Sequence, residues 1–106
     1  MVVVRGTNDD YRDRHPGPTV VLVVEVSDST LRRDQGFKKA IYAKAGIAVY
    51  WIVNLIDRRI EIYSEPSGAG EAADYRVRAD VAETENVPLV IDGLEITRIA
   101  ARDLLP

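Results

Sequence analysis

Residues 20–26 read Val-Val-Leu-Val-Val-Glu-Val, an apolar run that a single acid interrupts. Apolar residues on both faces are typical of a central strand that is covered on each side. A helix is predicted over residues 31–45, with turn and N-cap chemistry in residues 27–30 and Gly46 as its C-terminal stop. The next apolar run, residues 49–54, indicates a second strand. This strand–helix–strand order favours a crossover connection and at least one parallel pairing in a mixed sheet.

Further elements are predicted on either side of this unit from β-branched runs and turn-forming residues. They are a strand at residues 2–5, a polar loop at 6–18, a strand at 59–64 that forms a hairpin with 49–54, a loose loop at 64–73, a strand at 75–81, one or two short strands within 87–97 broken at Asp92-Gly93, and a short helix within 98–105. We therefore predict an α/β (α+β) domain. A chain of 106 residues leaves no room for two independent cores, so we expect one domain over residues 1–106.

Composition excludes several classes of protein. Val (14) and Ile (9) together outnumber Leu (7), which favours a sheet-rich domain over a helical bundle. The chain contains no Cys, which excludes disulfides and thiolate metal sites. Its longest apolar run is far shorter than the roughly 20 residues needed to span a bilayer, and no signal peptide is recognisable. We therefore expect a soluble, cytoplasmic protein.

Charge is distributed unevenly along the chain, whose net charge is −3. Residues 1–60 carry 10 basic and 7 acidic side chains, net +3, whereas residues 61–106 carry 4 and 10, net −6. The chain as a whole lacks the excess of basic charge that dedicated nucleic-acid binders usually have. The predicted helix nevertheless carries Arg32, Arg33, Lys38, Lys39 and Lys44. These side chains either contact phosphates or form a solvated helix face.

The predicted helix is amphipathic when 100° is assigned to each residue. Phe37, Ile41 and Ala45 share one face, which we expect to pack against the sheet. Lys38 lies at the border of this apolar stripe, and Lys39 is expected to point to solvent.

Glu25 does not fit its surroundings, because it shares a strand face with Val21 and Val23. A buried carboxylate without a partner costs several kcal/mol, so it is paired, protonated, metal-bound or turned to a cleft. Lys38, on the following helix, is the nearest available cation. An acid at a strand end and a lysine on the next helix could hold a divalent metal and a polarised water. A Glu25–Lys38 ion pair that merely satisfies itself is the open alternative.

Other candidates are weaker. Ser27 and Ser29 lack a histidine to act as base and more plainly cap the helix. The one histidine, His15, lies in a loop rich in Pro and Gly. Asp28 and Asp34 could be outer metal ligands, but acids are favoured in the first turn of any helix.

Three segments together resemble the Uma-type restriction endonuclease family of bacteria, a branch of the PD-(D/E)XK nuclease superfamily. They are residues 18–30 (Pro-Thr-Val-Val-Leu-Val-Val-Glu-Val-Ser-Asp-Ser-Thr), residues 33–47 (Arg-Asp-Gln-Gly-Phe-Lys-Lys-Ala-Ile-Tyr-Ala-Lys-Ala-Gly-Ile) and residues 50–53 (Tyr-Trp-Ile-Val). The resemblance continues through Gly-Leu-Glu-Ile at 93–96 and Asp-Leu-Leu at 103–105. It implies a restriction-endonuclease-like mixed sheet and magnesium- or manganese-dependent attack of water on DNA phosphodiesters.

The resemblance also implies roles for particular residues. Glu25 matches the family's second acidic metal ligand, and Val26 would offer its backbone carbonyl to the ion. Ser27 stands where the wider superfamily places its lysine, and Lys38 matches the lysine that this branch supplies from the helix. Lys38 would orient or help deprotonate the attacking water and offset the charge that develops on the phosphate. Apart from the resemblance, if the basic residues of the helix contact phosphates rather than water, we expect Arg32, Arg33 and Lys39 to be the residues that bind DNA.

Two departures from the family pattern bear on activity. The family's first acidic ligand comes from a Pro-Asp pair just before the strand that residues 2–5 resemble, and the sequence starts past it; Asp9, Asp10 and Asp13 are poor substitutes. The family also has Glu and Asp where this chain has Val49 and Asn54. We therefore expect an N-terminally shortened member, either a DNA endonuclease or an inactive remnant of one. The alternative is a non-catalytic module that acts through protein contacts, and in both cases we expect a homodimer or higher oligomer.

Overall fold

The computed structural model describes residues 1–4, 20–68 and 70–106. The predicted loop at 6–18, together with Arg5, His15 and the acids at positions 9, 10 and 13, lies outside the described residues. None of the helices in the described ranges has the length and apolar character needed to span a bilayer.

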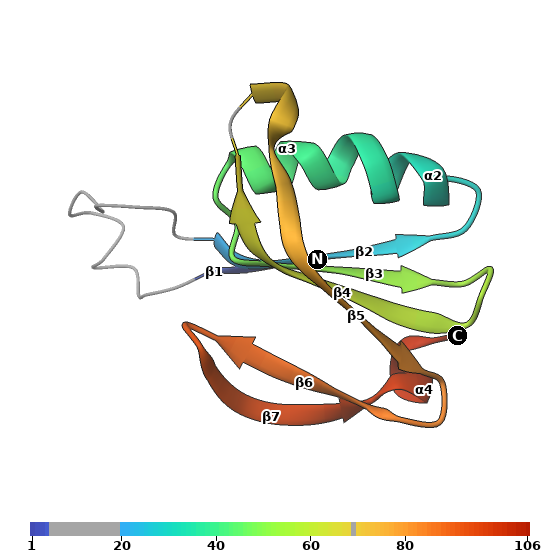
Figure 1. Cartoon of the computed structure of the whole chain (residues 1–106). Helices are drawn as coiled ribbons and strands as arrows, with labels where there is room; N and C mark the ends of the chain where they lie inside the picture. Colours follow the sequence, from blue (N-terminus) through green and yellow to red (C-terminus); the bar gives the residue numbers. More distant parts are fainter. Residues whose placement is uncertain (5–19, 69) are drawn as a thin grey trace.

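Within these ranges, five strands form a mixed sheet in the order β1-β2-β3-β4-β5 (Figure 1). The bounds are Val2–Val4 for β1, Val20–Ser27 for β2, Val49–Asn54 for β3, Arg59–Ser67 for β4 and Asp74–Ala82 for β5. Strands β2 and β3 run parallel, and the other neighbours are antiparallel. The predicted mixed sheet, crossover and hairpin are therefore confirmed. The predicted loose loop at 64–73 is wrong at its start, because β4 continues to Ser67 and pairs there with Asp74.

The crossover helix consists of three consecutive parts that lie over one face of the sheet (Figure 1). They are α2 (Leu31–Arg33), the π-helical turn η1 (Asp34–Lys38) and α3 (Lys39–Lys44). A π turn accommodates an extra residue, and such turns are frequent at functional sites. Gly46 follows the helix with φ +75°, a conformation that favours glycine at a helix end.

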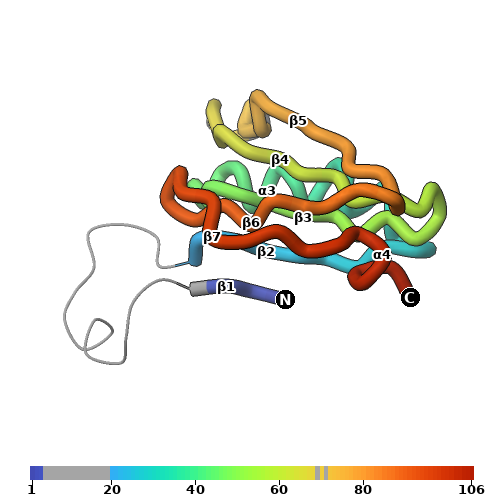
Figure 2. Tube along the Cα trace, turned by 90° about the horizontal axis from the view of Figure 1, so that it is seen from below, coloured from blue at the N-terminus to red at the C-terminus, as the bar shows by residue number. Residues whose placement is uncertain are grey.

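The opposite face of the sheet is covered by a hairpin and a short helix. The hairpin joins β6 (Asn86–Ile91) to β7 (Leu94–Ala100), and α4 (Ala101–Leu104) follows it. Figure 2, seen from the hairpin side, shows β6 and β7 crossing over the sheet, with the long helix behind it. The predicted break at Asp92-Gly93 is confirmed, whereas the predicted terminal helix begins later because residues 98–100 extend β7.

The two faces of the sheet differ in chemistry. The hairpin side holds an aliphatic core around the single tryptophan, formed by Val21, Leu22, Val24, Trp51, Val53, Ile60, Val87, Ala101 and Leu105. The helix side is lined by tyrosines: the rings of Tyr42 and Tyr50 lie 4.9 Å apart, and those of Tyr50 and Tyr63 5.8 Å apart. Polar groups are thus concentrated between the helix and the sheet.

The predicted apolar stripe of the helix is wrong. Phe37 and Ile41 are 68% and 47% exposed, and Ala45 is exposed as well. The side chains that meet the sheet include Asp34, Lys38 and Tyr42 instead. The physical reason is that the sheet face beneath the helix carries acids and tyrosines, which need hydrogen-bonding partners rather than methyl groups.

Candidate active site

Glu25 lies on β2, two residues before the strand ends at Ser27. Its side chain points to the helix side of the sheet and is 26% exposed. The Nζ atom of Lys38 lies 3.5 Å from its Oε2 atom, so the predicted contact between the two side chains is confirmed. Because Lys38 is 34% exposed, this ion pair is open to solvent on one side.

Asp34 is a third member of this cluster. Its Oδ1 atom lies 3.4 Å from Lys38 Nζ, and its side chain is 1% exposed. The Oδ1 atom is buried without a hydrogen bond, whereas Oδ2 accepts hydrogen bonds from the hydroxyls of Ser27 and Thr30. The lysine ammonium therefore lies between two carboxylates, one half-buried and one buried.

The hydroxyls of Ser27 and Thr30 bind this carboxylate rather than the helix end. Thr30 occupies the N-cap position but makes no side-chain capping bond, and its Oγ1 donates to Asp34 Oδ2 at 3.0 Å. The predicted capping role of Ser27 is wrong for the same reason, since its hydroxyl donates to Asp34. A buried carboxylate is the stronger acceptor, which explains the preference.

Tyr42 fixes the other oxygen of Glu25. Its hydroxyl donates to Glu25 Oε1 at 2.8 Å, which leaves Oε2 directed at Lys38. Burial, together with the hydrogen bond and the negative charge of Glu25, raises the pKa of Tyr42 to about 12. Tyr42 therefore stays protonated at neutral pH and acts as a constant donor to the carboxylate.

The backbone carbonyl of Val26 points to the β1 side of β2. Val24 N–H donates to the carbonyl of Met1 at 2.7 Å on that side, whereas Ser27 accepts from Leu55 N–H at 2.9 Å on the β3 side. Backbone groups alternate between the two sides of a strand, so those of Val26 point the same way as those of Val24. The described pairing of β1 ends opposite Val24, which leaves the Val26 carbonyl beyond it.

The oxygens of Glu25 and Val26 are of the chemical type that a hard divalent cation binds. Glu25 offers a carboxylate oxygen and Val26 a neighbouring carbonyl oxygen, the ligand types that Mg²⁺ and Mn²⁺ prefer. No group of three or more acidic, histidine or cysteine side chains suited to a metal occurs in the described ranges. Mg²⁺, however, is commonly held by one or two carboxylates and keeps several waters.

The structure separates the predicted DNA-binding bases. Arg32 and Arg33 are exposed, as that role requires. Lys39 does not point to solvent as expected: its Nζ lies 3.1 Å from Asp74 Oδ1 and 5.0 Å from the centre of the Tyr63 ring. With its side chain 22% exposed, Lys39 ties the helix to β4 and β5 and is removed from the candidate DNA contacts.

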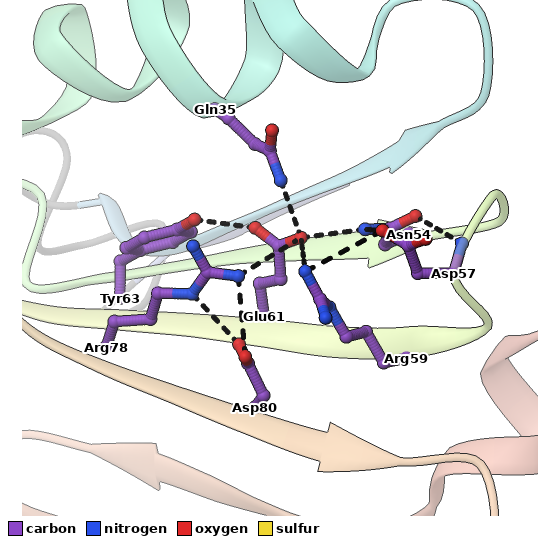
Figure 3. Close-up of polar contacts among 8 residues, drawn as sticks. All are labelled: Gln35, Asn54, Asp57, Arg59, Glu61, Tyr63, Arg78 and Asp80. Atoms are coloured by element: carbon purple, nitrogen blue, oxygen red, sulfur yellow. Dashed lines mark hydrogen bonds and ion pairs between the residues drawn. The ribbon is translucent and has the colours of Figure 1, made fainter.

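A second polar cluster, centred on Glu61 of β4, was not predicted. The Glu61 side chain is fully buried. Its oxygens accept hydrogen bonds from Gln35 and Asn54, both at 2.8 Å, and from Tyr63 at 2.6 Å. The guanidiniums of Arg59 and Arg78 lie 3.6 and 3.7 Å from Oε2 (Figure 3). Sequence reasoning missed it because an acid in the alternating run 59–64 normally marks the solvent face.

The two clusters are joined through the sheet and through the helix. In the strand register Glu25 is opposite Ile52, and Ile52 is opposite Glu61, so the two acids lie in one row on the same face. In the π turn, Asp34 reaches the first cluster and its neighbour Gln35 reaches the second. The turn thus holds the helix to both acids at once.

Comparison with known proteins identifies the family. No curated protein is significantly similar to the chain. The model of the Uma2 family, described as "Putative restriction endonuclease", matches residues 1–99. The match spans nearly all of the chain, including the strand and helix that carry Glu25, Asp34 and Lys38, and the mixed sheet with its crossover helix agrees with it. The chain therefore belongs to the Uma2 family of restriction-endonuclease-like proteins.

Proposed function

We propose that the chain is a metal-dependent endonuclease that hydrolyses DNA phosphodiester bonds at the Glu25–Lys38 centre. One observation carries the proposal: Lys38 Nζ lies within 3.5 Å of Glu25 and 3.4 Å of Asp34, and the Glu25–Lys38 pair is partly exposed. A partly exposed ion pair contributes only about 0–1 kcal/mol to stability, so stability alone gives little reason for this pair. An exposed pair at the end of a central strand is instead accessible to a substrate.

Glu25 and the carbonyl of Val26 would hold Mg²⁺ or Mn²⁺. A bound ion supplies a nucleophilic water at neutral pH and polarises the phosphoryl oxygens. Tyr42 is a positioning residue, because its hydrogen bond to Oε1 sets the direction of Oε2.

Lys38 would orient the attacking water and offset the negative charge that develops on the phosphate. The lysine side chain carries several N–H donors, so Lys38 can contact both carboxylates and still donate to a water beside them. Asp34 keeps Lys38 in place and is itself held by Ser27 and Thr30. The charge of Lys38 is thus preorganised in the absence of substrate, and preorganised charges stabilise a transition state most effectively.

The test is nicking or linearisation of supercoiled plasmid DNA with Mg²⁺ or Mn²⁺. We expect Glu25→Gln and Lys38→Met each to lower the rate roughly a hundredfold or more, and Glu83→Gln, an exposed acid in a surface ion pair with Arg58, to leave it unchanged. Thermal unfolding establishes that each variant is folded.

Titration with Mn²⁺ alone separates the metal site from the chemistry. We expect Glu25→Gln to abolish binding heat and Lys38→Met to retain it. If the chain cuts DNA and both variants cut equally well, the centre is not catalytic. If the folded chain neither binds Mn²⁺ nor cuts, Glu25 and Lys38 form a self-contained ion pair.

A further inference from the structure

The helix turns its apolar side chains outward. Phe37 is 68% and Ile41 47% exposed, although they are one turn apart and their positions suit packing. Asp34, Lys38 and Tyr42 face the sheet instead. An exposed aromatic ring next to an exposed aliphatic side chain forms a small apolar patch, and apolar patches rimmed by polar residues mark binding surfaces.

These side chains lie on the side of the helix that is turned away from β4 and β5. Lys38 and Tyr42 reach β2, whereas Lys39, one residue after Lys38, reaches β4 and β5. Each residue advances the helix by about 100°. Phe37 precedes Lys38 and Ile41 precedes Tyr42, so Phe37 and Ile41 are rotated further from β4 and β5 than Lys38 and Tyr42 are.

Cations flank the apolar pair on the same side. Arg33 lies four residues before Phe37 and Lys44 three residues after Ile41, and both are exposed. Asp34 is the one acid among residues 31–45, and it is buried. We call Arg33, Phe37, Ile41 and Lys44 the Phe37 ridge. Its charge is positive within a chain whose net charge is −3.

The chemistry of the ridge selects its occupant. Two copies of the ridge repel each other, since both are cationic. An acidic peptide matches the charge, but its Asp and Glu side chains offer no flat surface on which the ring can stack. A single-stranded nucleic acid supplies both phosphates for the cations and unstacked bases for the aromatic ring.

We propose that the Phe37 ridge binds single-stranded nucleic acid, with Phe37 stacking on a base and Arg33 and Lys44 contacting phosphates. The inference rests on the proposed function in one respect: a nucleic-acid strand bound along the ridge would continue to Glu25 and Lys38, where its backbone would be cut. It deepens that function by naming the substrate as single-stranded DNA or a duplex with unpaired bases, whose exposed faces a protruding ring can reach.

The test is fluorescence anisotropy with a labelled single-stranded oligonucleotide and the duplex of the same sequence, in EDTA so that nothing is cut. We expect tighter binding of the single strand. Phe37→Ala should weaken it about tenfold, within the range for loss of one stacked base, and Phe37→Tyr should retain it. Leu94→Ala, also an exposed apolar residue but on the hairpin side of the sheet, is the matched control.

The inference would be overturned by no binding of the single strand, by equal binding of the single strand and the duplex, or by equal affinity of Phe37→Ala and the unaltered chain. It would also be overturned if poly-glutamate displaced the labelled strand as well as an unlabelled strand does. A dimer that Phe37→Ala converts to monomer in sedimentation would also overturn it, by showing a second copy on the ridge. Binding that depends on Phe37 without any cleavage would support the binding role of the ridge and refute the proposed nuclease activity. Cleavage together with binding that does not depend on Phe37 would support the nuclease activity and refute the binding role of the ridge.

Discussion

Glu61→Ala removes the acceptor on which the second polar cluster converges. The substitution leaves Gln35, Asn54 and Tyr63 without their shared partner beneath the helix. Breaking a buried ion pair on one side typically costs 3–5 kcal/mol. The two arginines are 34% and 43% exposed and can turn to water, so we expect the lower end, about 3 kcal/mol.

For a chain of this length, about 3 kcal/mol corresponds to a fall in Tm of roughly 12 °C or more. The measurement is thermal and urea unfolding followed by far-UV circular dichroism and by the fluorescence of Trp51, the one tryptophan, which is 1% exposed. Glu61→Gln keeps one acceptor oxygen, so its free energy of unfolding should lie between those of Glu61→Ala and the unaltered chain.

Glu83→Ala is the matched control, because Glu83 is an exposed acid paired with Arg58 and such pairs contribute about 0–1 kcal/mol. If Glu61→Ala costs no more than Glu83→Ala, the buried network does not hold the helix to the sheet. The reasoning about the polar layer would then fail.

Two further predictions concern pH and backbone. Burial first, and then its bond to Glu25, raises the pKa of Tyr42 from 10.0 to about 12; the unfolded chain loses this proton first, so stability is complete below pH 10.0 and is lost as pH rises toward about 12. The part of the tyrosinate absorbance that Tyr42→Phe removes should therefore appear together with unfolding, and its non-cooperative appearance near pH 10.0 in the folded chain would contradict this. Gly68→Ala should destabilise by more than about 1 kcal/mol in urea unfolding, because φ is +84° and a Cβ would overlap the Ala72 carbonyl. At Gly46, where φ is +75° and the space is open, alanine should cost only about 1 kcal/mol; equal effects would show that the overlap is relieved.

The strands could be predicted because their signals are local. The apolar run at 20–26, the hairpin around residues 56–58 and the turn at Asp92-Gly93 each specify an element with its neighbours in sequence. The proximity of Glu25 and Lys38 followed from the strand–helix connection alone. These predictions needed no knowledge of which strands lie beside one another.

The helix orientation and the Glu61 cluster could not be predicted from local pattern. Apolar periodicity assigned Phe37 to the core, but the sheet beneath the helix presents Glu25 and Glu61 in one row. That row exists only once the strands are aligned in register. The hydrogen bonds that the two buried or half-buried acids need then outweigh the burial of one ring. The same helix orientation places Lys39 against Asp74 and the ring of Tyr63.

Both faces of the sheet bury an apolar cluster, but the helix side adds a layer of charges and hydrogen-bond donors, so the two faces respond differently to the solvent. The hairpin side depends on hydration of aliphatic groups and gains from sulfate or sucrose, which strengthen apolar burial. The helix side depends on charges and donors that mobile ions screen where they are exposed. Raising the ionic strength should therefore weaken the partly exposed Glu25–Lys38 pair, while the buried bonds to Glu61 and the aliphatic core of the opposite side are affected much less.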